Sequence, residues 1–504
     1  MALSAFANTV ILLMTGCFLM VIGGGLIAVF KRVIHNVISQ KMPLINGTES
    51  YETWKDPPVP VYMEFWVFDL VNPNEFLENG SKPVVKQLGP YVYREVRTKQ
   101  ELIFHKNDTL SYKEPKTYVF DPDKSTGSED DTITSVNLLF VTVVDALDRL
   151  APGWIKKLGG EYVVDKLLGL LGNHVFTKQK VGDVIWGKPN LVLELIHDIL
   201  KTFHIDVAIP EEVGLFAGQN GTDDGLYTVY TGTGGKLDNL NIINKWNGES
   251  SLPYWNGTLC NMINGTDGTL YHPFVDKSET LYLFSTDICR SIYVTYDSDQ
   301  TNYGIQLYRF VPPLEVFANH TENPVNKGYC RPDCLGAGVL DITPCKGAPV
   351  IISQPHFYQA APYYINAIQG MHPNKEEHET FVDVEPNTGA VMNAAKRLQI
   401  NIHLKNISDV TELAKIPPTI FPVAWVNETA KIDEATADKF THEVMLPILA
   451  TTIVQYALMA LGFLLILVGI VYASKKRVCH RKQAGYQSIN GEVKEEDSVS
   501  PVNT

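Results

Sequence analysis

The chain has 504 residues, of which 45% are hydrophobic and 19% are charged, and its formal net charge is −14. This length is enough for one large or two medium domains with a packed core. An acidic surface argues against nucleic-acid binding, and it suits an acidic compartment, where carboxylates begin to protonate and repel one another less.

The first predicted element is a membrane-spanning helix at residues 9–30. This stretch carries no charged side chain, and about 20 apolar residues suffice to cross a bilayer. A cleaved signal peptide is the alternative, but its apolar region is usually about 7–15 residues long. No small-residue cleavage site follows before Lys31. We therefore expect an uncleaved anchor after a short cytosolic segment, residues 1–8.

The segment between the two predicted spans, residues 31–443, is expected to be a lumenal domain rich in antiparallel strands. Apolar and polar residues alternate in PVYMEFWVF (60–68) and RLQINIHLK (397–405), which is typical of strands. ETLYLF (279–284) and SIYVTYD (291–297) are rich in β-branched and aromatic residues. The expected fold class is α+β, dominated by a large antiparallel β architecture.

Residues 138–202 differ, because apolar residues there recur at helical spacing. The helical segments are VVDALDRL (143–150), YVVDKLLGLLGNHVF (162–176) and LVLELIHDILKTF (191–203). The apolar stripe of the middle segment includes Val163, Leu167, Leu168 and Leu171. This stripe either packs as core or is exposed in part as a docking surface for a partner or lipid.

Nine Asn-x-Ser/Thr sequons lie between the predicted spans, and none contains proline. They begin at Asn46, Asn79, Asn107, Asn220, Asn256, Asn264, Asn319, Asn406 and Asn427. This density predicts a glycosylated domain on the lumenal or extracellular side.

Five of the seven cysteines fall within this domain, at Cys260, Cys289, Cys330, Cys334 and Cys345. In an oxidising compartment they indicate disulfides, and zinc is the weaker interpretation because no paired C-x-x-C motifs occur. Since five is an odd number, one thiol should stay free. Cys17 lies in the first span, and Cys479 lies beside the second, where palmitoylation is one option.

The second predicted span covers residues 448–472 and is followed by a basic tail, 473–504. Basic residues beside a span tend to lie on its cytosolic side, which places this tail in the cytosol. Around the first span this tendency points the other way, since Lys31 and Arg32 follow the span. Tyr486 and Ile489 stand three positions apart in the tail. This Tyr-x-x-Φ pattern predicts a sorting motif that clathrin adaptors read as an extended peptide.

The sequence contains none of the common catalytic motifs: G-x-S-x-G, H-E-x-x-H and the P-loop are all missing. His197 and His204 are seven residues apart, but two histidines without a third ligand are more often surface residues than a metal site. We expect no enzyme activity, no metal and no cofactor. A membrane-tethered hydrolase is the alternative, which an activity assay on esters and glycosides would test.

Several stretches resemble the class B scavenger receptor family, and most of all its lysosomal member. They include CNMINGTDG (260–268), DICRSIYVTY (287–296), GVLDITPCKGAPVIISQPHFYQA (338–360) and MHPNKEEHETFVDVEPNTG (371–389). The resemblance implies a β-barrel-like core with a hydrophobic tunnel that moves lipid or sterol, and a helical cap at residues 138–202.

The resemblance also implies a receptor role, in which the cap carries acid glucosylceramidase to lysosomes, and it implies the bridges Cys289–Cys345 and Cys330–Cys334 with Cys260 free. The family's lysosomal member has a pH-sensing cap histidine, but this chain has no histidine between His105 and His174. His174 is the candidate to replace it. A cell-surface receptor for lipoproteins or fatty acids is the alternative function.

Overall fold

The computed structural model describes residues 2–150, 160–172, 174–189, 193, 198, 201, 212–331 and 333–495. The chain divides into two compact units. One unit combines the two ends of the chain, Met1–Ile38 and Asp438–Thr504, and the other is Ser39–Ala437. Each unit is described separately below.

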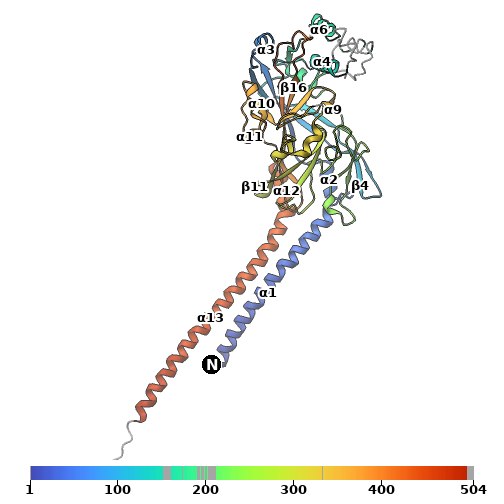
Figure 1. Ribbon diagram of the computed structural model, residues 1–504. Coiled ribbons are helices and arrows are strands. Elements are labelled where there is room, and N and C mark those ends of the chain that lie inside the picture. The colour runs from blue at the N-terminus through green and yellow to red at the C-terminus, as the bar shows by residue number, and fades with distance from the viewer. Residues whose placement is uncertain are drawn as a thin grey trace, which may run out of the picture. The chain divides into compact units, whose positions relative to one another are not determined.

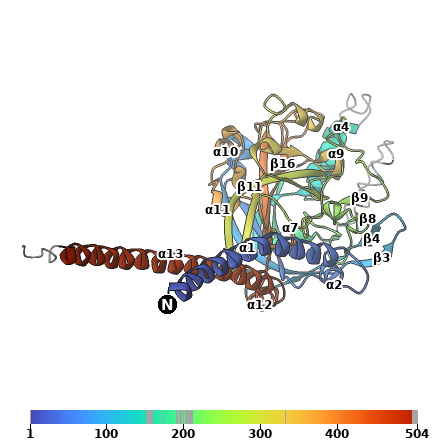
Figure 2. The same cartoon turned by 90° about the horizontal axis from the view of Figure 1, so that it is seen from below.

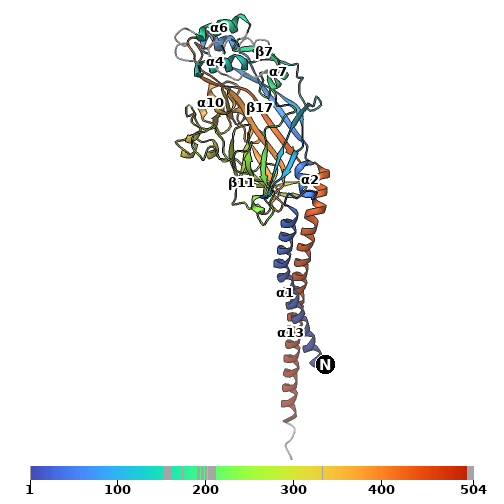
Figure 3. The same cartoon turned by 90° about the vertical axis from the view of Figure 1, so that its right-hand side faces the viewer.

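The terminal unit contains two long helices, α1 (Ala2–Lys41) and α13 (Leu446–Glu495). Both include a stretch that is long and apolar enough to cross a membrane, within Ala7–Lys41 and Glu434–Cys479. The predicted spans 9–30 and 448–472 fall inside these helices. Figures 1 and 3 show the two helices lying side by side.

The two helices approach closely where glycines face the partner helix. A Cβ placed on Gly16 would lie 2.7 Å from the carbonyl oxygen of Gly462, and one on Gly23 would lie 2.5 Å from Cγ of Met459. Gln455 Nε2 donates a hydrogen bond to the carbonyl oxygen of Leu26 at 3.4 Å. Small residues at the contact and a polar side chain turned toward the partner are typical of paired membrane helices.

The other unit is built on an 11-stranded sheet whose main path runs β10–β11–β12–β15–β16–β17–β1–β2–β5. The short strands β13 and β14 pair with each other, and β14 also pairs with β16. The strands are β1 (Val61–Leu70), β2 (Val85–Arg97), β5 (Lys116–Phe120), β10 (Thr280–Ser285), β11 (Arg290–Asn302), β12 (Ile305–Val311), β13 (Val339–Asp341), β14 (Val350–Ser353), β15 (Phe381–Val384), β16 (Val391–Leu404) and β17 (Thr419–Lys431).

The four strands predicted from sequence patterns are confirmed, but the expected barrel is wrong. Residues 60–68, 279–284, 291–297 and 397–405 correspond to β1, β10, β11 and β16. The sheet does not close on itself in the described part of the chain, because β10 and β5 end its path and do not pair with each other. The fold is therefore a mixed helix and sheet structure with an open sheet.

Smaller elements surround this sheet. A second sheet has the order β3–β4–β8–β9, and Figure 2 shows its strands grouped apart from β11 and β16. Its strands are β3 (Gln100–Phe104), β4 (Thr109–Lys113), β8 (Tyr227–Tyr230) and β9 (Ile243–Trp246). Short helices in this unit are α2 (Glu49–Lys55), α3 (Pro73–Asn79), α9 (Thr343–Lys346), α10 (Pro362–Ala367) and α11 (Lys375–His378), while α12 (Glu434–Phe440) begins at its end.

The predicted cap region, residues 138–202, is only partly helical. It contains α4 (Leu138–Leu150), α6 (Gly160–Leu170) and α7 (Val181–Trp186), which Figure 3 shows gathered at one end of the sheet. Between α6 and α7 the chain forms β7 (Phe176–Lys180), paired with β6 (Thr132–Val136). The helix expected to continue to residue 176 therefore ends earlier. The segment 191–203 lies almost entirely outside the described residues.

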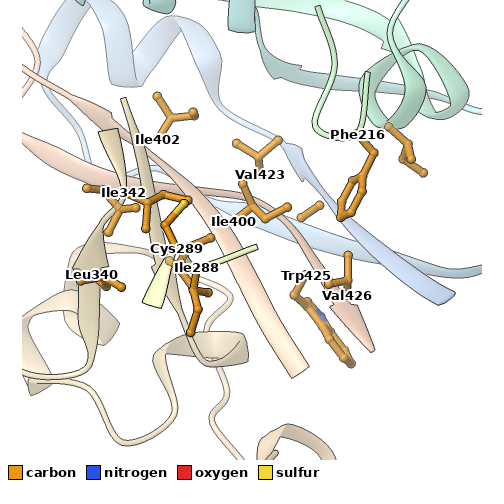
Figure 4. Close-up of a cluster of buried hydrophobic side chains, with 14 of the residues drawn as sticks. Phe216, Ile288, Cys289, Leu340, Ile342, Ile400, Ile402, Val423, Trp425 and Val426 are labelled. Carbon is orange, nitrogen blue, oxygen red and sulfur yellow. The ribbon is translucent and has the colours of Figure 1, made fainter. Parts of the chain in front are cut away.

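Apolar side chains from distant parts of this unit form one large core. Figure 4 shows part of it, in which Ile400 and Ile402 of β16, Val423 and Val426 of β17, and Phe216 belong to one cluster. Cys289 and Ile288 enter the same cluster from the turn between β10 and β11. This turn is important for the site described next.

Candidate functional site

A cavity of about 550 Å³ lies against the sheet in the large unit. Its wall includes residues 56–61, which precede and begin β1, and Tyr227 of β8. Apolar residues such as Leu283, Ile292 and Val382 line it beside several charged groups. We call it the smaller cavity.

A second cavity of about 970 Å³, the larger cavity, lies under α4. Leu139, Val143 and Ala146 of this helix line it, together with Ile400 and Ile402 of β16. Residues at these spacings share one helix face, so the amphipathic pattern that predicted α4 also supplies the apolar roof of the cavity.

The two cavities meet at four side chains that line both of them: Asp287, Lys396, Leu398 and Glu428. Lys396 of β16 and Glu428 of β17 stand directly opposite each other in the strand register. Lys396 Nζ donates to Glu428 Oε2 at 2.8 Å and also to Asp287 Oδ2. Arg97 donates from a terminal guanidinium nitrogen to Glu428 Oε1 at 3.1 Å. We call Asp287, Lys396, Glu428 and Arg97 the ion cluster.

The charges of the ion cluster reinforce one another. Burial opposes ionisation, but Lys396, Lys116 and Arg97 together hold the pKa of Glu428 well below its usual range. In the same way, Lys396 and Lys116 lower the pKa of Asp287 in spite of its burial. The cluster therefore stays ionised in mildly acidic solution.

Glu95 is the exception beside this cluster. Burial, and next to it the charge of Glu428, raise the pKa of Glu95. Its Oε1 accepts from Arg97 at 3.3 Å, whereas its Oε2 is buried without a hydrogen-bond partner. Glu95 is thus the carboxyl group here that gains a proton most readily.

Sequence patterns did not reveal the ion cluster, because its members come from distant segments. The sequence feature that could have indicated it is a charged residue on the same strand face as apolar residues, such as Lys396 two positions before Leu398. The strand pairing that joins them is visible only in the fold.

The predicted docking stripe on the cap is only partly exposed. Leu168 is fully buried, so its assignment to an exposed docking surface is wrong, and it belongs to the core. Leu171 is 40% exposed, and the neighbouring Leu170 and Tyr162 are 85% and 54% exposed. Val163 and Leu167 lie in α6, but their side chains fall outside the described residues.

His174 is exposed and close to a carboxylate. Its Nδ1 lies 2.5 Å from Glu412 Oε1, and the backbone N–H of Val175 donates to Glu412 Oε2 at 2.8 Å. A protonated imidazole would form an ion pair with this carboxylate. The two contacts join the cap to the 410–413 turn.

The cysteines form the two pairs implied by the family resemblance. Disulfides join Cys289 to Cys345 and Cys330 to Cys334, whereas Cys260 is free and buried. Cys260 Sγ donates a weak hydrogen bond to the carbonyl oxygen of Val325 at 3.3 Å. His320 lies near Cys330 and Cys334 at a distance suited to a metal site, but both sulfurs are already joined in the disulfide.

Most sequon asparagines are exposed. Asn46, Asn79, Asn107, Asn220, Asn256 and Asn406 are exposed, and Asn264 and Asn319 are half-buried. Asn427 is buried in β17, and its Nδ2 donates to Glu64 Oε2 at 2.8 Å. Since a glycan would be attached to this nitrogen, the prediction of a glycan at Asn427 is wrong for the folded chain. Glycans at the other positions stay predictions.

The predicted sorting residues lie in the last part of α13. The backbone of Tyr486 and Ile489 is helical, and their side chains are outside the described residues. The structure therefore leaves the sorting motif as a prediction.

Comparison with known proteins gives one consistent picture. The model of the CD36 family matches residues 14–473. Lysosome membrane protein 2 of Homo sapiens is 40% identical over 439 residues, which cover 86% of this chain and 88% of that protein. Lysosome membrane protein 2 of Rattus norvegicus is 39% identical over the same shares. Scavenger receptor class B member 1 of Sus scrofa is 34% identical over 458 residues, 91% of this chain and 87% of that protein.

Proposed function

The chain belongs to the CD36 family, and on this premise we propose that it is a two-pass lysosomal membrane glycoprotein with two activities. One is to carry a lumenal hydrolase, acid glucosylceramidase, to lysosomes. The other is to conduct lipid, including cholesterol, through its lumenal domain. The single observation that carries the proposal is 40% identity to human lysosome membrane protein 2 over 86% of the chain.

Exposed apolar residues in α6 and directly after it support the receptor activity. Leu170, Leu171 and Tyr162 offer a small apolar surface on the cap, and apolar anchors of this kind dominate the energy of protein interfaces. A charge buried in such an interface is costly. Leu170→Asp should therefore abolish capture of acid glucosylceramidase by the full chain in detergent at neutral pH.

A matched control for this experiment is Leu314→Asp. Leu314 is 61% exposed and lies in the turn Leu314–Phe317, away from α6 in the sequence. This variant should capture the enzyme as well as the parent chain does. If the Leu170→Asp chain captures the enzyme as well as the parent chain does, this surface is not the docking site.

The two cavities support the conduit activity, because their walls combine apolar strands with the apolar face of α4. Full chain reconstituted in vesicles should speed the transfer of a fluorescent sterol into acceptor vesicles. Protein-free vesicles provide the control. If both preparations transfer sterol at the same rate, the chain is not a conduit.

The tail supports sorting through clathrin adaptors. In a Tyr-x-x-Φ motif, Tyr486 would be an aromatic anchor, whose loss typically costs about 2 kcal/mol or more, roughly thirtyfold in affinity. Tyr486→Ala should move the tagged chain from lysosomes to the cell surface. Ile489→Leu should have little effect, because the second pocket requires only an apolar side chain of similar size. Normal delivery of the Tyr486→Ala chain without passage through the surface would place the sorting signal elsewhere.

A cell-surface receptor for lipoproteins or fatty acids is the second candidate. It is favoured by 34% identity to scavenger receptor class B member 1 over 91% of the chain. The steady-state location of the tagged parent chain separates the two candidates, since a cell-surface receptor would be found mainly at the plasma membrane.

A further inference from the structure

The boundary between the two cavities is polar, although the surfaces on either side contain many apolar residues. The side chains that line both cavities are Asp287, Lys396, Leu398 and Glu428. The side chains of Asp287 and Lys396 keep 37% and 32% of their exposed area. This ion pair thus faces open space and is not sealed in packed core.

The ion pair joins two opposite walls. Lys396 and Glu428 belong to paired strands of the main sheet, whereas Asp287 stands in the turn between β10 and β11. That turn is fixed by the Cys289–Cys345 disulfide and by Trp255, whose Nε1 donates to the carbonyl oxygen of Cys289 at 2.7 Å. Asp287 is therefore held in place across from Lys396.

The two carboxylates differ in how firmly they are bound. Glu428 has a second partner in Arg97 and would stay paired if Lys396 moved. Asp287 is bound to the sheet through Lys396. Because Asp287 lies outside the β16–β17 pair, the contact between Lys396 and Asp287 links the turn to these strands, and its opening would part the two walls.

We infer that Asp287, Lys396 and Glu428, closed by Leu398, form a charged partition that keeps the two cavities separate, and that a lipid crosses only when Lys396 and Asp287 separate. The inference deepens the proposed lipid route, and the partition itself can be tested without any transport. It makes Lys396 and Asp287 the residues that control passage between the cavities.

The test uses the full chain with one new thiol in each cavity. Ala394 lines the smaller cavity and Ala348 lines the larger one, and alanine to cysteine changes the volume little. A bis-maleimide with a spacer matched to the straight line between the two thiols is added, and the cross-link is measured by peptide mapping. The parent chain, which lacks both new thiols, shows how much cross-linking arises from the native free cysteines Cys17, Cys260 and Cys479.

The partition is opened by Asp287→Asn combined with Lys396→Met. This pair removes one anion and one cation, keeps the side-chain volumes, and leaves Glu428 paired with Arg97. The parent partition should allow labelling of each thiol by a monofunctional maleimide but almost no cross-link. The opened variant should cross-link at least tenfold more, and adding Leu398→Trp should abolish this gain.

Two results would overturn the inference: efficient cross-linking across the parent partition, or no gain in the opened variant. If the opened variant unfolds, Asp287→Asn alone replaces it, because Lys396 then keeps Glu428. The separate sterol-transfer assay decides the proposed function. Absence of transfer by the parent chain would reject the conduit, while the cross-linking result would still decide whether the partition exists.

Discussion

Lys99 is a fully buried cation held by two carboxylates. Its Nζ lies 2.9 Å from Glu114 Oε1 and 3.6 Å from Asp267 Oδ2, and it stands 5.0 Å from the ring centre of Trp54. Burial alone would raise the pKa values of Glu114 and Asp267, but Lys99 lowers both, together with Arg97 and Lys116 at Glu114 and with hydrogen bonds from Thr269 and Asn241 at Asp267. Lys99 is the cation that both acids share.

Lys99→Met should destabilise the chain strongly. Removing one partner of a buried ion pair typically costs about 3–5 kcal/mol. A carboxyl with a lowered folded-state pKa stabilises the fold above its unfolded pKa and loses this effect as pH falls through the folded pKa. The loss caused by Lys99→Met should therefore be largest near pH 7 and shrink as the pH falls below about 4, from the ordinary pKa values of the two acids toward their lowered values in the folded chain.

Denaturant unfolding at both pH values measures this effect. Lys113→Met is the control, because Lys113 pairs with Glu101 at 3.3 Å on the surface, where such pairs contribute about 0–1 kcal/mol. A Lys99→Met chain as stable as the Lys113→Met chain at pH 7 would contradict the prediction.

His356 and His378 form a buried pair of stacked imidazoles, with ring centres 4.6 Å apart. Burial lowers the pKa of His356 to about 3 and that of His378 to about 4. Nδ1 of each ring accepts a backbone N–H, from His372 and Asn374 respectively. Both rings are therefore neutral even in an acidic compartment.

Because the unfolded chain protonates these histidines below about pH 6.5 and the folded chain does not, this pair should make stability fall as pH drops from about 6.5 to 4. One such histidine lowers the free energy of unfolding by at most about 2 kcal/mol at pH 5. His378→Asn keeps an oxygen that can accept from Asn374 and removes the titrating group. Its melting temperature should fall less steeply with acidification than that of the parent chain, and parallel melting curves would contradict the prediction.

At the scale of elements, β16 shows both the reach and the limit of sequence patterns. Alternation in residues 397–405 correctly predicts a strand, but Gln399 and Asn401 on its polar side are also fully buried. Gln399 Oε1 accepts from the backbone N–H of His356, and Asn401 Nδ2 donates to the carbonyl oxygen of Ile351. Their partners lie in segments that pack over this side of β16. The alternation of apolar and polar residues does not predict that other segments will bury the polar side.

The cap illustrates a second limit. Helical spacing correctly predicted α4 and the start of α6, but it also extended through residue 176, where β7 begins. The tertiary pairing of β7 with β6 overrides local periodicity there. Leu168 and Leu170 are both apolar residues of α6, yet one is buried and the other exposed, which depends on packing that the sequence alone does not specify.

The contact between α1 and α13 gives a prediction at this scale. Gly462→Leu would place a side chain where a Cβ already meets the carbonyl oxygen of Gly16 at 2.7 Å, so the helices should separate. A disulfide between Leu12→Cys and Gly469→Cys reports their contact, because the Cβ positions are 3.5 Å apart. Its yield should fall several-fold.

Gly24→Leu is the matched control for this change. A Cβ at Gly24 meets no atom within 4 Å, so the extra side chain has room and the disulfide yield should stay at the parent level. Equal yields in the Gly462→Leu and Gly24→Leu chains would show that glycine does not determine the pairing.

At the scale of the whole molecule, the charged partition predicts which lipids pass. As Lys396 and Asp287 separate, Lys396 loses one of its two carboxylate acceptors and Asp287 loses the ammonium donor, and one hydroxyl group can replace both. A fluorescent sterol should therefore transfer at least about tenfold faster than its methyl ether, since hydrogen bonds to charged groups contribute about 1.5–3 kcal/mol.

The opened variant, Asp287→Asn with Lys396→Met, is the control for this selectivity. With the ion pair gone, the sterol and its ether should transfer at similar rates. Equal rates in the parent chain would show that the ion pair does not select the cargo.

The pairing of β1 with β17 has a consequence for how the protein is made. Val61 lies opposite Ala430 in this pairing. The first strand of this domain therefore cannot form the pair until β17, near the end of the domain, has been synthesised. Until then, β1 and β16 each present an unpaired edge, which favours association with other chains. A product that ends between β16 and β17 exposes both edges, and such products should depend on chaperones and be degraded.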